Sequence, residues 1–220
     1  MKKHYSEELN HLKEMVLRMG GLVEKMTHQA VQALVERKRK KFSEVQEMEK
    51  QVNQLHMDID EIALGMIALR QPTATDLRFI TAAMKINTDL ERIGDQAINI
   101  VEQAEKLVSV PSVKPLIDIP RMAEIAEEML KAALDAFVKG DVESAYRTIE
   151  RDDAVDQLKD QVFRELLTFM MADASTIAPS MDLILVSRHL ERIADHATNI
   201  CEDVIFMVKG KDVRHQGPLA

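Results

Sequence analysis

The sequence predicts an all-α protein made of two tandem, similar three-helix bundles. Three observations support this fold class. Glycine and proline are sparse, with 7 and 6 among 220 residues, while helix-forming Leu, Ala, Met, Glu and Lys are abundant. Apolar residues recur at the three- and four-residue spacing of amphipathic helices. A stretch near the middle of the chain recurs near its end, which indicates an internal duplication.

Six helices are expected in total, and the longest of them span about 30 residues, or roughly 45 Å. Helices of that length need packing partners along their whole course, which favours bundles over isolated helices. The expected ranges are 6–41, 43–70, 75–108, 118–139, 141–172 and 177–209.

Several of these helix ends carry start or stop signals. Ser43 followed by Gln46 matches a capping box that would open the second helix. The other signals are glycines just beyond helix ends and prolines in the turns before the third and sixth helices: Gly140, Gly210, Pro72 and Pro179.

The proline distribution predicts the domain organisation. Residues 109–120 contain Pro111, Pro115 and Pro120, which are half of the prolines in the chain. A segment so rich in proline reads as a linker between helical units. We therefore expect a first bundle at 1–110, a linker at 111–120, a second bundle at 118–210 and a C-terminal tail at 211–220.

The repeat itself is clearest in the third and sixth helices. Residues 90–100 align with residues 190–200, and eight of the eleven positions are identical. Further upstream the offset becomes 103, so that Met26 aligns with Met129. The turn before the last helix is three residues shorter than the equivalent turn of the first half, which accounts for the change of offset from 103 to 100.

Composition and charge exclude several classes of function. The formal net charge is −8, from 29 basic and 37 acidic side chains, so nucleic acid is not an expected partner. The sequence contains no run of about 18 apolar residues, which is the length that a membrane-spanning helix needs. Gly-rich nucleotide-binding motifs are missing, and no set of residues suggests a catalytic site or an organic cofactor. The single cysteine, Cys201, allows no intrachain disulfide.

Rows of oxygen-bearing side chains are the main chemical feature of the sequence. The third and sixth helices carry them at i, i+4 and i+8, on the side opposite an apolar stripe. The second and fifth helices carry related rows that could converge with them. The candidate metal ligands on these rows are Glu49, Asn53, Glu91, Asp95, Asn99, Asp152, Asp156, Glu191, Asp195 and Asn199.

Carboxylates stacked at i, i+4 repel one another, and a bound cation would offset that repulsion. Hard divalent metals take several oxygen ligands, which such rows supply. The alternative is a solvated acidic face paired with Arg92 and Arg192. The Glu-x-x-His pairs of di-iron bundle proteins do not occur on these rows.

The one basic cluster runs over residues 36–41, at the expected end of the first helix. Cations there would meet the negative end of the helix dipole. The sharper alternative is docking to an acidic protein or to an anionic membrane surface, so any membrane association would be peripheral at most.

Several motifs together resemble the PhoU family of bacterial phosphate-regulation proteins, and the resemblance covers nearly the whole chain. They are Arg18-Met19-Gly20, the segment 69–78 (LRQPTATDLR), the segment 90–95 (LERIGD) and the segment 188–200 (RHLERIADHATNI).

The resemblance implies two similar bundles and Glu/Asp-x-x-x-Asp motifs that can hold multinuclear clusters of iron or zinc, with Mg or Mn as other possibilities. When the family's metal-binding motif is carried over residue by residue, the second half has all of its acidic residues: Asp152, Asp156, Glu191 and Asp195. The first half departs, because Asn53 replaces an acid. We expect a weaker or emptier site there.

The resemblance also implies a cytoplasmic negative regulator of the phosphate-starvation response and of phosphate uptake, with no enzymatic activity. Its expected partners are the ATPase of the phosphate ABC transporter and a membrane sensor histidine kinase. The exposed faces of long helices suggest a homodimer. The alternative function is a carboxylate-bundle metalloprotein that stores metal or uses it in catalysis.

Overall fold

The computed structural model describes residues 2–213, with side chains from residue 5 onward, and the chain within that range is helical with short connections. Residues 214–220 of the predicted tail lie outside it. The elements are α1 (Lys2–Glu36), α2 (Lys40–Arg70), α3 (Ala74–Leu107), α4 (Asp118–Lys139), α5 (Val142–Ile149), α6 (Asp152–Ala172), a 3₁₀ turn (Ala174–Thr176) and α7 (Ile177–Lys209). The all-α prediction is confirmed.

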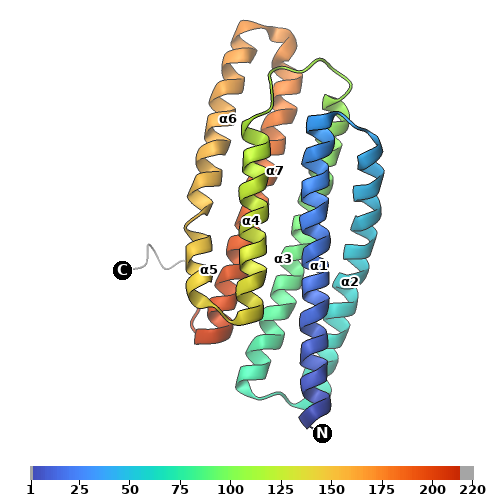
Figure 1. Ribbon diagram of the computed structural model, residues 1–220, viewed down its shortest axis with the longest axis vertical. Helices are drawn as coiled ribbons and strands as arrows, with labels where there is room; N and C mark the ends of the chain where they lie inside the picture. Colours follow the sequence, from blue (N-terminus) through green and yellow to red (C-terminus); the bar gives the residue numbers. More distant parts are fainter. Residues whose placement is uncertain (1, 214–220) are drawn as a thin grey trace.

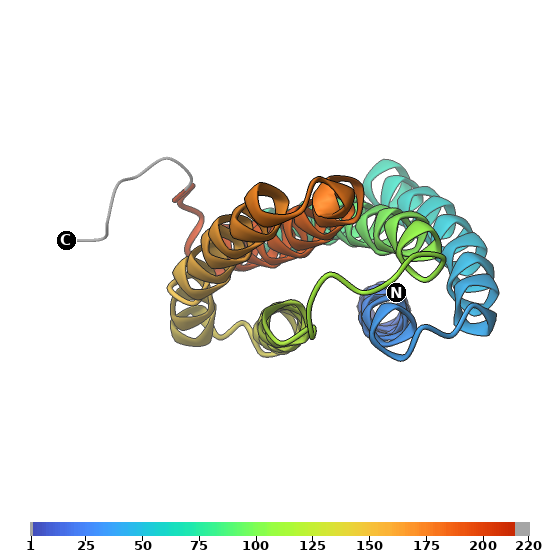
Figure 2. The same cartoon turned by 90° about the horizontal axis from the view of Figure 1, so that it is seen from above.

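Helices α3 and α7 pack against each other at the centre of the molecule (Figure 1). They run antiparallel, since Lys85 of α3 pairs with Asp203 of α7 at 3.0 Å while Lys106 pairs with Asp182 at 3.8 Å. Seen from above, α1 and α4 cover one side of this pair, and α2 and α6 lie toward the two outer edges (Figure 2). The two halves are thus joined along their repeated helices.

One continuous hydrophobic core extends through both halves. The apolar stripes predicted on the third and sixth helices supply its centre, because their spacing places them on one side of each helix. The fully buried members of these stripes are Leu90, Ile93, Ala97, Ile100, Ala104, Leu190, Ile193, Ala197, Ile200 and Val204.

The predicted helix at 141–172 is divided in two, so the described residues contain seven α-helices rather than six. Glu150 and Arg151 keep helical backbone angles. However, the Arg151 N–H bonds to the Thr148 carbonyl, and Ala154 N–H bonds to the Arg151 carbonyl, in the tighter 3₁₀ pattern. The local tightening interrupts the α-helix without reversing the chain.

The stop signals of the sequence are confirmed and two of the start signals are wrong. Gly140 and Gly210 end α4 and α7 in the left-handed conformation, with φ of 65° and 67°. Ser43 does not open α2, which begins at Lys40; its hydroxyl donates to the Lys40 carbonyl instead. Pro179 lies within the first turn of α7, where a missing N–H costs no helical hydrogen bond.

The basic run also differs from its prediction. Helix α1 ends at Glu36, so residues 37–39 form the turn to α2 and Lys40 and Lys41 begin that helix. The cations therefore do not extend α1 as its last turn. Two of them, Lys38 and Lys41, pair with Glu36 at 2.9 and 3.0 Å.

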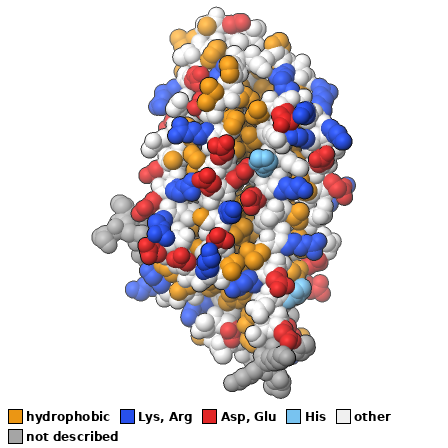
Figure 3. All heavy atoms as spheres, viewed as in Figure 1, with side chains coloured by type: hydrophobic (Ala, Val, Ile, Leu, Met, Phe, Trp, Pro, Cys, Tyr) orange, Lys and Arg blue, Asp and Glu red, His pale blue; other side chains and the backbone are white. Residues whose placement is uncertain are grey.

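The face formed by α1 and α4 carries acidic and basic side chains intermixed, with hydrophobic side chains visible between them (Figure 3). Within residues 2–213, none of the helices has the length and apolar character needed to cross a bilayer.

Candidate functional site

An acidic cluster lies between α6 and α7, which pack together in the second half. It consists of Asp152 and Asp156 on α6 and Glu191 and Asp195 on α7, and we call it the second-half cluster. Lys159, one turn after Asp156, bridges the two helices. Its Nζ lies 2.7 Å from Asp156 Oδ1 and 3.0 Å from Glu191 Oε1.

Crowding of like charges shows in the acidity of this cluster. Burial, followed by the charges of Asp195, Asp156, Glu191 and Asp153, raises the pKa of Asp152 to about 6. Partial desolvation, then Glu191 and Asp156, raises the pKa of Asp195. The hydrogen bonds to Asp156 and Glu191 raise the pKa of Lys159. The cluster therefore has a local excess of negative charge that one ammonium group does not remove.

The first-half cluster, formed by Glu49 on α2 with Glu91 and Asp95 on α3, is arranged differently. Arg92 lies on the same helix as two of these acids and pairs with Glu91 at 3.5 Å and with Asp95 at 3.3 Å. Burial, then Asp95 and Glu102, raises the pKa of Glu49. Asn53 is exposed on α2. The expectation of a weaker metal site in the first half stays a prediction.

A line of polar side chains joins α3 to α7 between these clusters. His196 Nδ1 lies 2.8 Å from Asp89 Oδ1, and the amide of Asn199 donates to the same oxygen at 3.2 Å. His189 Nδ1 lies 2.9 Å from Gln96 Oε1. Positions 89 and 96 align with 189 and 196 in the repeat, so the two pairs are equivalent. We call these five residues the polar seam.

The surroundings of His189 define the protonation state of this member of the polar seam. Burial, then Arg192 and Arg188, lowers the pKa of His189 to about 4, so this imidazole is neutral at pH 7 and bonds Gln96 as a neutral ring. Beside the seam, Arg92, Arg192, Asp195 and His196 line an open hollow of about 530 Å³.

The predicted metal ligands are thus only partly brought together. Asp152, Asp156, Glu191 and Asp195 interact with one another, and Glu49 interacts with Asp95. Asn199 is engaged by Asp89 across the seam. Asn99 is partly buried on α3, and the described residues show no hydrogen bond from it to the acids.

The donor chemistry suits a hard cation, because carboxylates on two packed helices face one another with excess negative charge. The positions of these carboxylate side chains, however, do not form a complete metal site. Within residues 2–213, no three His, Cys, Asp or Glu side chains are placed to share one metal ion. Lys159 occupies the space between two of the carboxylates. Metal binding therefore stays a prediction.

Sequence reasoning missed Lys159 and the polar seam. Lys159 stands three residues after Asp156, a spacing that favours an ion pair on a helix, so this signal was available. The seam depends on which way α3 and α7 run past each other. Nothing in the repeat alone gives that direction.

Comparison with known proteins places these features in a family. The model of the PhoU domain matches the chain twice, at residues 16–104 and 119–204. A phosphate-specific transport system accessory protein PhoU homolog of Pseudomonas putida is 39% identical over 98% of this chain and 84% of its own length. The homolog of Caulobacter vibrioides is 40% identical over 98% of this chain and 94% of its own length.

Solved structures agree with this likeness along the whole fold. The crystal structure of PhoU from Pseudomonas aeruginosa superposes with a TM-score of 0.90 at 38% identity, covering 94% of this chain and all of that one. The phosphate transport system regulatory protein PhoU from Streptococcus pneumoniae gives 0.87 at 26% identity, covering 95% and 99%. Two copies of one family domain, full-length relatives and matching crystal structures together show that this chain belongs to the PhoU family.

Proposed function

We propose that this protein is an accessory and regulatory protein of phosphate-specific transport that represses the phosphate-starvation response. The observation that carries the proposal is the likeness along the full chain to proteins named as accessory or regulatory proteins of phosphate transport. The fold agrees with it, because the long helices of both halves present extended surfaces to partners. A regulatory role without catalysis fits the residues that the site brings together.

The proposal is tested in a strain that lacks this gene and carries an alkaline phosphatase reporter of phosphate starvation. On ample phosphate, the deletion strain should express the reporter at starvation levels, and a plasmid copy of the gene should restore repression. Normal repression in the deletion strain, with no second PhoU-family gene present, would contradict the proposed role.

The finer part of the proposal is an adaptor that links the transporter ATPase to the sensor histidine kinase as a cytoplasmic homodimer. Its support is the role that the resemblance implies, together with the long helical surfaces of both halves. Co-purification of the tagged full chain with each partner, expressed separately, tests it. Recovery of neither partner would contradict the adaptor role, and light scattering gives the oligomeric state.

We also propose that the second-half cluster binds a metal cation, with iron, zinc, Mg and Mn as the ions to compare. Asp152, Asp156, Glu191 and Asp195 would hold it, and the bound ion would neutralise their mutual repulsion. The support is the raised pKa of Asp152 and of Asp195, together with the shared location of the four carboxylates.

The measurement is a titration of the chelator-treated full chain with Zn²⁺ and Mn²⁺ by calorimetry. The double variant Glu191→Gln, Asp195→Asn should lose most of the heat. Glu143→Gln, an exposed acid on α5, is the matched control and should bind like the wild type. Equal binding by the double variant would show that the cation sits elsewhere.

A further inference from the structure

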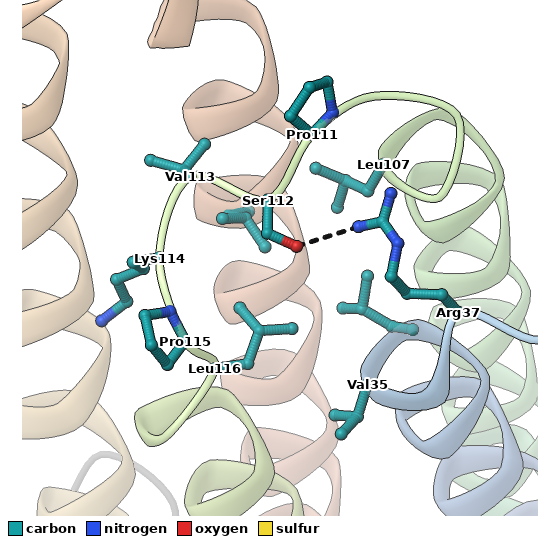
Figure 4. Close-up of a pocket in the computed structure, with 11 residues that line it drawn as sticks. Val35, Arg37, Leu107, Pro111, Ser112, Val113, Lys114, Pro115 and Leu116 are labelled. Atoms are coloured by element: carbon teal, nitrogen blue, oxygen red, sulfur yellow. Dashed lines mark hydrogen bonds between the residues drawn. The ribbon is translucent and has the colours of Figure 1, made fainter.

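A cavity of about 450 Å³ lies under the linker that joins the two halves (Figure 4). Its walls come from the end of α1, the end of α3, the linker itself and α7. Three of its lining leucines, Leu34, Leu107 and Leu183, are buried, and the linker contributes two prolines and Val113 to the lining. The apolar lining residues are Leu34, Val35, Leu107, Pro111, Val113, Pro115, Leu116 and Leu183.

Arg37 stands at the mouth of this cavity in an unusual backbone conformation. Its φ is +56°, in the left-handed region where a side chain with a Cβ is disfavoured. Position 37 aligns with position 140 in the repeat, and Gly140 ends α4 there with φ of +65°. The first half thus uses arginine where the second half uses the residue that this turn favours, which indicates a task for the side chain.

The guanidinium group of Arg37 reaches from α1 to the linker. One Nη1–H donates to Ser112 Oγ at 3.0 Å, and Nη2 donates to the carbonyls of Val108 and Val110. All three acceptors are neutral. No carboxylate within residues 2–213 pairs with Arg37, and two of its five N–H groups have no acceptor there.

Lys114, the other cation of the lining, is in the opposite situation. Its Nζ pairs with Asp118 at 3.3 Å and also with Glu165. These two acids compensate its charge. Arg37 is therefore the cation of this cavity whose charge remains available to an anionic ligand.

We propose that the cavity binds a small amphiphile with an anionic head group. The aliphatic part lies against Leu34, Leu107 and Leu183, and the head group accepts hydrogen bonds from Arg37 at the mouth. A volume of about 450 Å³ falls within the usual range of small-molecule sites, which combine an apolar lining with a few polar groups. A ligand there touches both halves and the linker between them.

The test is calorimetric titration of the full chain with octanoate, below its micelle concentration. Octanol presents the chain without the charge, and acetate presents the charge without the chain. We expect octanoate to bind about tenfold more tightly than octanol, the factor that a charge-assisted hydrogen bond supplies, and acetate not to bind. No octanoate binding, or equal affinity for octanol, overturns the proposal.

Variants separate the head-group contact from the cavity itself. Arg37→Gly suits the backbone and should lower octanoate affinity to that of octanol, whereas Arg37→Lys should keep most of the preference. Val35→Trp, at a wall position that is 44% exposed, should fill the cavity and abolish binding of both probes. If Arg37→Gly loses octanol binding as well, Arg37 holds the roof and the head-group assignment is wrong.

Arg39→Ala is the matched control. Arg39 lies in the same turn and donates to Ser109 Oγ at 2.6 Å, but it does not line the cavity. It should bind both probes like the wild type. A loss equal to that of Arg37→Gly would mean that general positive charge, rather than the Arg37 site, attracts octanoate, and would overturn the proposal.

Discussion

In the first half, Arg92 pairs with Glu91 and Asp95 on its own helix, whereas in the second half the equivalent Arg192 makes no ion pair within the described residues. There, Lys159 from the neighbouring helix joins Asp156 to Glu191. The same duplicated backbone thus pairs two of its carboxylates with a cation of the same helix in one half, and with a cation that joins two helices in the other. Conserving the acidic positions does not fix the electrostatics of the two clusters.

The largest effect should come from a packing position where the halves differ. A Cβ on Gly20 would lie 2.4 Å from Leu134 Cδ1, so α1 and α4 approach closely at this point. Its equivalent in the repeat is Ala123. Gly20→Val should destabilise the protein by about 1–3 kcal/mol, the usual cost of overpacking, measured by urea unfolding.

Gly21→Val is the control, because no atom lies within 4 Å of a Cβ at Gly21 and the change should be nearly neutral. Leu134→Val in the Gly20→Val background should recover part of the loss. If both glycine variants unfold at the same urea concentration, the close approach of α1 and α4 has no energetic consequence.

The next effect concerns the departure at Asn53, an exposed residue of α2 that aligns with Asp156 in the second half. Asn53→Asp restores the carboxylate of the row, and we expect it to raise the affinity of the first half for Zn²⁺ about tenfold, which corresponds to about 1.4 kcal/mol. Asp156→Asn is the reciprocal change and should lower second-half affinity by a similar factor. Calorimetric stoichiometry and affinity check both.

Each reciprocal variant serves as the other's control, since each alters one aligned position. Unchanged binding in both variants would mean that the row on α2 and α6 contributes no ligand. If Asn53→Asp gains Zn²⁺ affinity and Asp156→Asn loses none, the carboxylate at this aligned position matters only in the first half. That result would contradict the prediction from the sequence that the second half holds the complete site.

A smaller effect is expected where α4 ends. Gly140 has φ of +65°, and a Cβ there would make only ordinary contact with Val208 at 3.5 Å. Gly140→Ala should therefore cost about 1 kcal/mol, the conformational penalty of the left-handed region, in thermal or urea unfolding. Gly210→Ala, at the last turn of α7, should cost less because that turn can fray. A neutral Gly140→Ala would show that this turn relaxes.

The fold was predictable from sequence to a large extent because its signals are local and repeated. The apolar stripe through Leu90 and Ile93 fixes the buried side of α3, and its copy at Leu190 and Ile193 does the same for α7. The interruption at Glu150 was not predictable, because both sides of it favour helix and the residues there keep helical angles.

The site was less predictable, because it depends on how helices pass one another. Glu191 and Asp195 share a helix face by spacing alone, but the bridge from Lys159 needs the distance between α6 and α7. The pairing of His196 with Asp89 needs the antiparallel register of α3 and α7. The cavity beside Arg37 needs the path of the linker, which proline content alone does not give.

The smallest effect concerns the pH dependence of stability in the second-half cluster, measured with a chelator present. The pKa of Asp152 is raised from 3.8 to about 6 in the folded protein. The folded state therefore holds this proton more tightly, and its contribution to stability is lost as pH rises from about 4 to about 6.

Asp152→Asn should be more stable than the wild type at pH 7, by less than about 1 kcal/mol because solvent screens a partly exposed group. It should also show a flatter loss of stability across that pH range. Glu143→Gln, at an exposed position of α5 outside the cluster, should keep the wild-type slope. If Asp152→Asn is instead less stable at pH 7, the charge of Asp152 is favourably paired, and the interpretation that the second-half cluster carries excess negative charge is wrong.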